Sequence, residues 1–132
     1  MTSTLLKNRP FQGGVLTGLM ALALTGVQAQ SPIAPHSLAA SPDIYKVIAE
    51  NDKYRVIEVT WQPGQRDKMH SHPDSATYFP MDCMLRAFGA NGELIGQRLA
   101  QAGSAGVQIP IPAHSVENAG TTACKLVMFE PK

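Results

Sequence analysis

Residues 64–73 read GQRDKMHSHP, and residues 110–118 read PIPAHSVEN. In an extended strand alternate side chains share a face, so His70 and His72 are expected to point the same way. His114 comes from a distant part of the chain, and its imidazole could complete a site with three nitrogen ligands. Neutral imidazole is the commonest metal ligand, and three protein ligands with an open position are typical of a reactive centre. The two segments therefore predict a metal site made by His70, His72 and His114.

The chain after residue 42 is patterned as short strands and turns. Residues 54–61 alternate between apolar and polar side chains and contain β-branched residues, which favours a strand. Asn91 and Gly92 tolerate positive φ and so predict a tight hairpin, whereas Pro80 predicts a bulge or an edge position. We expect strands at 44–49, 54–61, 69–72, 77–88, 93–100, 107–111, 115–118 and 123–130. Short strands without a helical period predict an all-β sandwich or barrel.

The first 29 residues have the three-part pattern of a secretory signal peptide. Lys7 and Arg9 give a positive start, residues 15–27 form an apolar run, and Ala29 closes a small-residue cleavage motif. The apolar run is short for a membrane span. We predict cleavage after Ala29, which would place the mature protein in the periplasm or outside the cell. An uncleaved membrane anchor stays the alternative.

Residues 30–42 contain three prolines among serines and alanines, and we expect them to form an extended arm or linker. His36 lies in this segment without a partner in the local sequence, so we expect it at the surface. A total length of 132 residues favours a single domain. The predicted organisation is therefore a signal peptide at 1–29, an arm at 30–42 and one β domain at 43–132.

Charge and aromatic content argue against one class of partner. The chain has 11 Lys and Arg against 10 Asp and Glu, a formal charge of +1, and only 6% aromatic residues. Proteins that bind nucleic acid need a basic surface or a platform of stacking rings, so we expect no nucleic-acid partner. We also expect no membrane contact once the signal peptide has been removed.

The chain has two cysteines, Cys83 and Cys124, each in a segment expected to be a strand. An exported protein meets an oxidising environment in which a disulfide can persist. Pairing requires the two strands to lie close together with suitable Cβ directions. The alternative is that both are small buried hydrophobic side chains. They do not form a Cys-x-x-Cys pair, so a redox motif is not expected.

The two histidine segments resemble the motifs of the cupin family. Gly64, five intervening residues and His70-Ser71-His72 resemble the first half of the first motif, and Pro112-Ala113-His114 with Asn118 resembles the end of the second. The resemblance covers residues 44–130. It implies a single cupin-type jelly-roll β-barrel. It also implies a divalent metal held inside the barrel by the two histidines of the first motif, a Glu, and the histidine of the second.

This chain departs from the family pattern at the glutamate. Family spacing puts that residue at position 76 or 77, where Ala76 and Thr77 stand. The role of the Glu is therefore not carried over, and three neutral imidazoles would leave the full charge of the metal uncompensated. Asp74 is the best substitute carboxylate, although Pro73 disturbs its strand geometry. Asn118 matches the second motif but is expected to serve as a structural turn residue.

Other side chains are candidates for the interior of the barrel. Tyr78 could present a phenol near the histidines, and its alternative is an ordinary aromatic of the barrel. Trp61 is expected in the core or at the rim. Four methionines are expected mainly to fill the core, although a thioether can also bind copper; these are Met69, Met81, Met84 and Met128.

Three hypotheses about function follow from these residues. The chain is an exported cupin enzyme acting on a small organic molecule through a bound metal, a module that binds a small ligand or metal without turnover, or a structural cupin domain without metal. Zinc, iron, manganese, nickel and copper are all candidates, because ligand type alone does not select among metals. A homodimer is a further expectation, since exposed sheet edges need protection or pairing.

Overall fold

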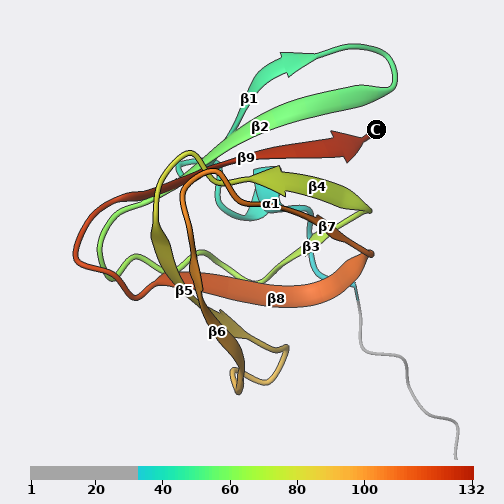
Figure 1. Cartoon of the computed structure of the whole chain (residues 1–132). Coiled ribbons are helices and arrows are strands. Elements are labelled where there is room, and N and C mark those ends of the chain that lie inside the picture. The colour runs from blue at the N-terminus through green and yellow to red at the C-terminus, as the bar shows by residue number, and fades with distance from the viewer. Residues whose placement is uncertain (1–32) are drawn as a thin grey trace, which may run out of the picture. The chain divides into compact units, whose positions relative to one another are not determined.

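The structure, a computed structural model, describes residues 33–132 (Figure 1). The predicted signal peptide at 1–29 lies outside the described residues. Within residues 33–132, no helix has the length and apolar character needed to cross a membrane. The elements in this range are α1 (Ser37–Ala40), β1 (Tyr45–Glu50), β2 (Tyr54–Trp61), β3 (His70–His72), β4 (Ser75–Tyr78), β5 (Cys83–Phe88), β6 (Leu94–Ala100), β7 (Ala105–Gln108), β8 (Ile111–Asn118) and β9 (Cys124–Pro131).

The strands form two antiparallel sheets. One sheet has the order β1-β2-β9-β4-β7, and the other has the order β3-β8-β5-β6. Several neighbours in the sheets are far apart in the chain: β2 pairs with β9 along its whole length, and β8 lies between β3 and β5. Figure 1 shows β2, β9 and β4 lying across from β8 and β5. The arrangement confirms the all-β jelly-roll fold predicted from the sequence.

The core lies between the two sheets and follows from strand alternation. On β2 the side chains of Ile57, Val59 and Trp61 are buried, and on β9 those of Leu126 and Met128 are buried beside them. Residues two apart in a strand share a face, so each strand contributes a row of apolar side chains. Sheet-on-sheet packing of such rows makes a dry interior. The prediction that Trp61 belongs to the core is confirmed.

Cys83 and Cys124 form a disulfide that links β5 in one sheet to β9 in the other. Both side chains are buried, and their Cα atoms are 5.2 Å apart. The alternative of two unpaired buried cysteines is therefore wrong. The two cysteines are 41 residues apart in the sequence. In the chain-entropy account, a disulfide that closes a loop of this length stabilises the fold by about 4 kcal/mol.

Three of the predicted strands are divided or joined differently in the structure. The segment 77–88 is two strands, β4 and β5, because Pro80 cannot donate to a ladder and the chain leaves the sheet around it. The segments 107–111 and 115–118 are also redistributed: β7 ends at Gln108, and β8 runs without interruption from Ile111 to Asn118. The hairpin at Asn91-Gly92 is as predicted, with Gly92 at φ +82°.

The described part of the predicted arm is not simply extended. Ser37–Ala40 forms the single turn α1, whose first free amide is satisfied when the Leu38 N–H donates to His36 Nδ1 at 3.2 Å. The residues before the turn lie along β3, since the Ser71 N–H donates to the Pro35 carbonyl at 2.9 Å. The segment therefore packs against the strand that carries two of the candidate ligands.

Candidate metal centre

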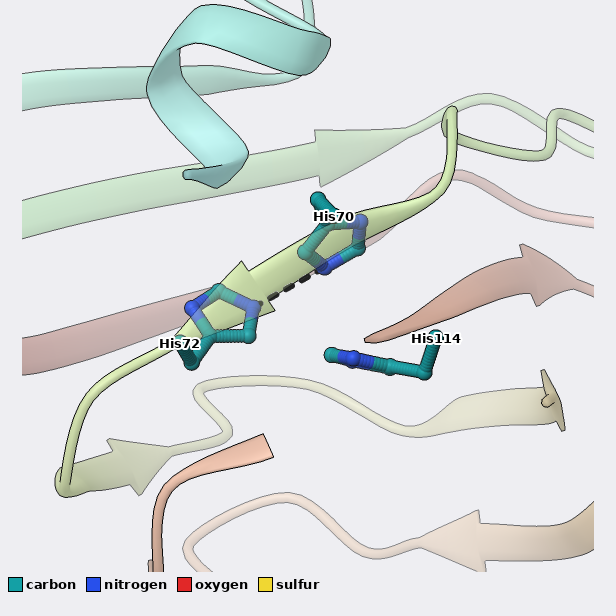
Figure 2. A group of neighbouring side chains, drawn as sticks. All are labelled: His70, His72 and His114. Carbon is teal, nitrogen blue, oxygen red and sulfur yellow. Dashed lines mark hydrogen bonds between the residues drawn. The ribbon is translucent and has the colours of Figure 1, made fainter. Parts of the chain in front are cut away.

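The three predicted ligands meet inside the barrel (Figure 2). His70 and His72 come from β3, and His114 comes from the adjacent β8, where it lies directly opposite His70. The three side chains are buried, at 0%, 5% and 6% exposure. One ligating nitrogen from each ring lies within 4.8 Å of the others. The convergence of His70, His72 and His114 that the sequence predicted is therefore what the fold produces.

Burial keeps two of these rings neutral. Removal from water lowers the pKa of His70 to about 3, with neighbouring His114 as the second cause. The same loss of hydration lowers the pKa of His114 to about 4, and the charge of His72 adds to it, while the His70 backbone partly offsets the shift. A neutral imidazole has a free lone pair, which is the form that ligates metals.

The outer nitrogens of the two β3 histidines are held by acceptors. His70 Nδ1 lies 2.7 Å from the carbonyl of Lys68, and His72 Nδ1 lies 2.6 Å from Glu130 Oε1. A carbonyl and a carboxylate can only accept, so both Nδ1 atoms carry a proton, and the neutral ring of His70 therefore has its lone pair on Nε2. Metal-bound histidines are oriented by partners of this kind.

The inner nitrogens of His70 and His72 lie at hydrogen-bond distance from each other. His70 Nε2 is 2.9 Å from His72 Nε2 and 3.2 Å from the Tyr45 hydroxyl oxygen. The Tyr45 hydroxyl donates its single proton to Asp67 Oδ2 at 2.7 Å, so its oxygen turns a lone pair towards His70. Several acceptors at such distances repel one another unless a positive charge lies among them. Either a metal cation or an additional proton on His72 would supply that charge.

His114 differs from its two partners in its surroundings. Its Nδ1 is buried and makes no hydrogen bond with any residue in the range 33–132. A buried polar atom without a partner costs about 1–3 kcal/mol, and such atoms in native structures often mark an unseen ion or water. The three imidazoles, each with a ligating nitrogen within 4.8 Å of the others, are a donor set that fits a metal ion.

Glu130 is a buried carboxylate that the sequence analysis missed. It is 1% exposed and accepts from His72 Nδ1 and, at 2.9 Å, from His36 Nε2. His36 was expected at the surface without a partner, and this expectation is wrong because the helical turn at α1 directs its ring towards Glu130. Alternation along β9 puts Glu130 on the same face as Leu126 and Met128, which is the signal that could have identified it.

A second buried carboxylate, Asp67, supports the site from the loop before β3. It accepts from the Tyr45 hydroxyl, from Trp61 Nε1 at 3.1 Å and from the Val116 N–H at 2.6 Å. Burial raises the pKa of Asp67 to about 6, against the opposing effect of these hydrogen bonds. Burial, and then the charge of Asp67, raises the pKa of Tyr45 well above its usual value. Asp67 stands in a loop without periodicity, so no sequence pattern marked it.

The substitute groups considered from the sequence lie elsewhere. Asp74 is exposed and is not part of the histidine cluster. Tyr78 is 49% exposed on the outer side of β4, and the phenol at the site is that of Tyr45. Among the four methionines, Met128 alone is buried. Asn118 is structural as predicted: its Nδ2 donates to the carbonyls of Trp61 and Thr122.

A cavity of about 310 Å³ opens on one side of the histidines. Its lining includes His72 and His114 together with Tyr45 and Thr77. Of the two residues at the family's glutamate position, Thr77 is therefore the one that faces the interior, whereas Ala76 is exposed. The site thus has protein carboxylates behind the imidazoles and a partly open cavity in front of them.

Comparisons with solved structures identify this architecture. The chain is similar to a cupin domain from Bordetella pertussis Tohama I, with a TM-score of 0.61 and 21% identity over 79% of this chain and 98% of that one. It is also similar to a protein with a double-stranded β-helix domain from Klebsiella pneumoniae, with a TM-score of 0.53, 21% identity, and coverage of 67% and 75%. No protein-family model and no curated protein matches the sequence.

A third similar structure is a sugar phosphate isomerase from a cupin superfamily of Silicibacter pomeroyi, with a TM-score of 0.51 and 14% identity over 76% of this chain and 67% of that one. Identities this low carry the fold and not the activity. The molecule is a small β-barrel with a buried three-histidine cluster. Its fold is that of the cupin superfamily, as the resemblance implied.

Proposed function

We propose that the domain holds a divalent transition metal between His70, His72 and His114 and binds a small organic molecule in the adjoining cavity. The observation that supports this proposal most directly is the meeting of the inner nitrogens. The Nδ1 atoms of His70 and His72 are committed to acceptors, so their Nε2 atoms oppose each other at 2.9 Å. A cation between the rings removes the repulsion and gives each lone pair a partner.

Different residues of the chain would have different roles around such an ion. The three imidazoles would hold it, and Glu130 and Asp67 would balance part of its charge from behind. Tyr45 and Trp61 are buried side chains of the cavity lining, and they would exclude water beside the imidazoles. A bound ion would supply Lewis-acid chemistry at a position open to the cavity. The described residues offer a hydroxyl at Thr77 and a phenol at Tyr45 as polar contacts for a ligand.

Metal analysis tests the proposal. Protein purified without chelator, and protein reloaded in turn with Zn²⁺, Fe²⁺, Mn²⁺, Ni²⁺ and Cu²⁺, would be measured by mass spectrometry for metal per chain. We expect about one ion per chain in at least one case, and its loss in both His70→Ala and His114→Ala. Tyr78→Ala, an exposed aromatic on β4, is the matched control and should retain the metal. A folded parent chain that takes up no metal would contradict the proposal.

A second candidate is a cluster that binds an organic ligand without metal. It is favoured by the short contact between His72 and Glu130, because a protonated His72 could donate to Glu130 and to His70 at once. Nitrogen-15 spectra of the imidazoles separate the two: a metal-free parent protein with His72 doubly protonated supports this candidate. Turnover on a substrate panel would then distinguish an enzyme from a binding module.

We also propose export to the periplasm or beyond. The Cys83–Cys124 disulfide supports this, since such bonds are rare in reducing compartments. Intact-mass measurement of the protein from a secreting host should show the loss of residues 1–29, and retention of the full chain in the cytoplasm would contradict it. The homodimer stays a prediction.

A further inference from the structure

The cavity in front of the histidines has an uneven distribution of charge. Within the described part of the chain, no Asp, Glu or Lys lines it, and Arg98 on β6 is the only Arg that does. Most of the wall is apolar and is formed by side chains such as Phe79, Leu126 and Met128. The cavity thus has histidines in one part of its lining, a guanidinium in another, and apolar side chains for most of the rest.

Arg98 is held in place and not neutralised. Its Cζ lies over the Phe79 ring, 5.1 Å from the ring centre. Because Phe79 is buried, this cation–π contact places the guanidinium beside a fixed side chain of the cavity wall. Among residues 33–132, no carboxylate forms an ion pair with Arg98. Arg86, on the neighbouring strand β5, does have such a partner in Glu117 at 3.5 Å.

The polar side chains of the lining restrict the chemistry of an occupant. Gln97 Oε1 already accepts from Arg86 Nε at 3.0 Å, and Gln108 Oε1 already accepts from the Ser75 hydroxyl at 3.3 Å. A ligand with many hydroxyls would find few partners here, and burying unpaired hydroxyls is unfavourable. A cationic ligand would be repelled by Arg98 and by any metal at the histidines. An anionic group on an apolar body meets neither obstacle.

We propose that this cavity binds a small organic anion, with its charged group at Arg98 and its apolar body extending along the cavity towards His72 and His114. The inference names the ligand class for the proposed function and rests on it for the role of the histidines. The contact with Arg98 itself requires no metal. The two claims can therefore fail separately.

Three ligands of one shape and different charge test the inference. Benzoate, benzamide and benzamidine are a planar anion, a neutral molecule and a cation, and each would be titrated by calorimetry into the parent protein, both metal-free and Zn²⁺-loaded. We expect benzoate to bind about fivefold or more tightly than benzamide, as one exposed Arg–carboxylate pair permits, and benzamidine to bind most weakly. Amide shifts in nuclear magnetic resonance spectra should follow the cavity lining at Thr77, Ile111 and Met128.

The Arg98→Gln variant should lose the preference for benzoate over benzamide and keep its metal content. Lys53→Gln removes one positive charge at an exposed position outside the cavity, and it should keep the preference. A preference that survives Arg98→Gln, or equal binding of benzoate and benzamide to the parent, overturns the inference even if one metal ion per chain is found. A preference that depends on Arg98 in a protein that takes up no metal supports it and defeats the proposed metal site.

Discussion

The two histidines of β3 and the histidine of β8 belong to one cluster but differ in the hydrogen-bond partners of their rings. His70 and His72 each have an outer nitrogen fixed by an acceptor, the Lys68 carbonyl and the buried carboxylate of Glu130 respectively. His114 lies opposite His70 in the sheet, but its Nδ1 is buried without a hydrogen-bond partner within residues 33–132. Two ligands are therefore oriented before anything binds, and the third is positioned by its strand alone.

This difference bears on the position where the cupin motif has a glutamate and this chain has Ala76 or Thr77. A carboxylate beside the metal would add charge and hold the ion directly. Here Glu130 and Asp67 supply negative charge from the far side of the imidazoles, where they also fix the rings or their neighbours. Carboxylates in this outer position raise the basicity of a histidine ligand and set its tautomer. On the cavity side of the imidazoles, no carboxylate of residues 33–132 lines the space.

Removal of Glu130 should produce the largest change. In Glu130→Ala, His72 loses the acceptor that fixes its proton on Nδ1, and we expect metal affinity to fall roughly 10–100-fold. In Glu130→Gln the amide has one acceptor oxygen for the two donors His72 and His36, so an intermediate loss is expected. Competition with a chelator of known affinity measures both.

The control for these variants is Glu58→Ala on the adjacent strand β2. Glu58 also pairs with a cation, Lys125 at 3.0 Å, but outside the barrel. The Glu58→Ala variant should therefore have the metal affinity of the parent protein. If Glu130→Ala bound metal as tightly as the parent protein, the distinction between the fixed and unfixed histidines would have no energetic meaning.

A carboxylate added on the cavity side of the imidazoles tests the role of the acids behind them in the opposite way. Thr77→Glu places an acid at the interior position that the family pattern reserves for one, and we expect metal affinity to rise by about tenfold, by analogy with the size of outer-shell effects. Ala76→Glu adds the same charge one residue earlier on the exposed side of β4. It should have no effect on metal affinity. Equal effects of the two substitutions would show that the gain came from net charge.

The sequence predicted what short-range pattern controls. The spacing of His70, His72 and His114 and the alternation of residues 54–61 were enough for the ligands and the jelly roll, because period-two geometry decides which side chains face inwards. The burial of Glu130 could have been predicted by the same reasoning, because strand alternation puts it on the inward face of residues 123–130. The sequence prediction did not assign a face to this single acid. The burial of Asp67 and the contact of His36 with Glu130 could not be predicted, since they depend on a loop and a helical turn folding back on β3.

The smallest predicted effect concerns Asp67 and the pH dependence of the metal-free protein. Between about pH 4 and 6 the unfolded chain protonates His70 and His114, from an ordinary pKa of 6.5, while the native rings with pKa values of about 3 and 4 stay largely neutral. Stability therefore rises with pH through this window. Asp67 acts oppositely, because its native pKa of about 6 exceeds the ordinary 3.8 and the native state holds the extra proton.

In Asp67→Asn the opposing contribution disappears. The variant should be less stable at every pH, because one amide oxygen replaces a carboxylate that accepts from three donors. Its stability should nevertheless rise more steeply between pH 4 and 6, by up to one additional proton, or about 1.4 kcal/mol per pH unit. Urea unfolding of both proteins across this range measures the two slopes. Parallel slopes would mean that Asp67 is already ionised in the native state, and that the histidines have an unopposed negative charge behind them even without metal.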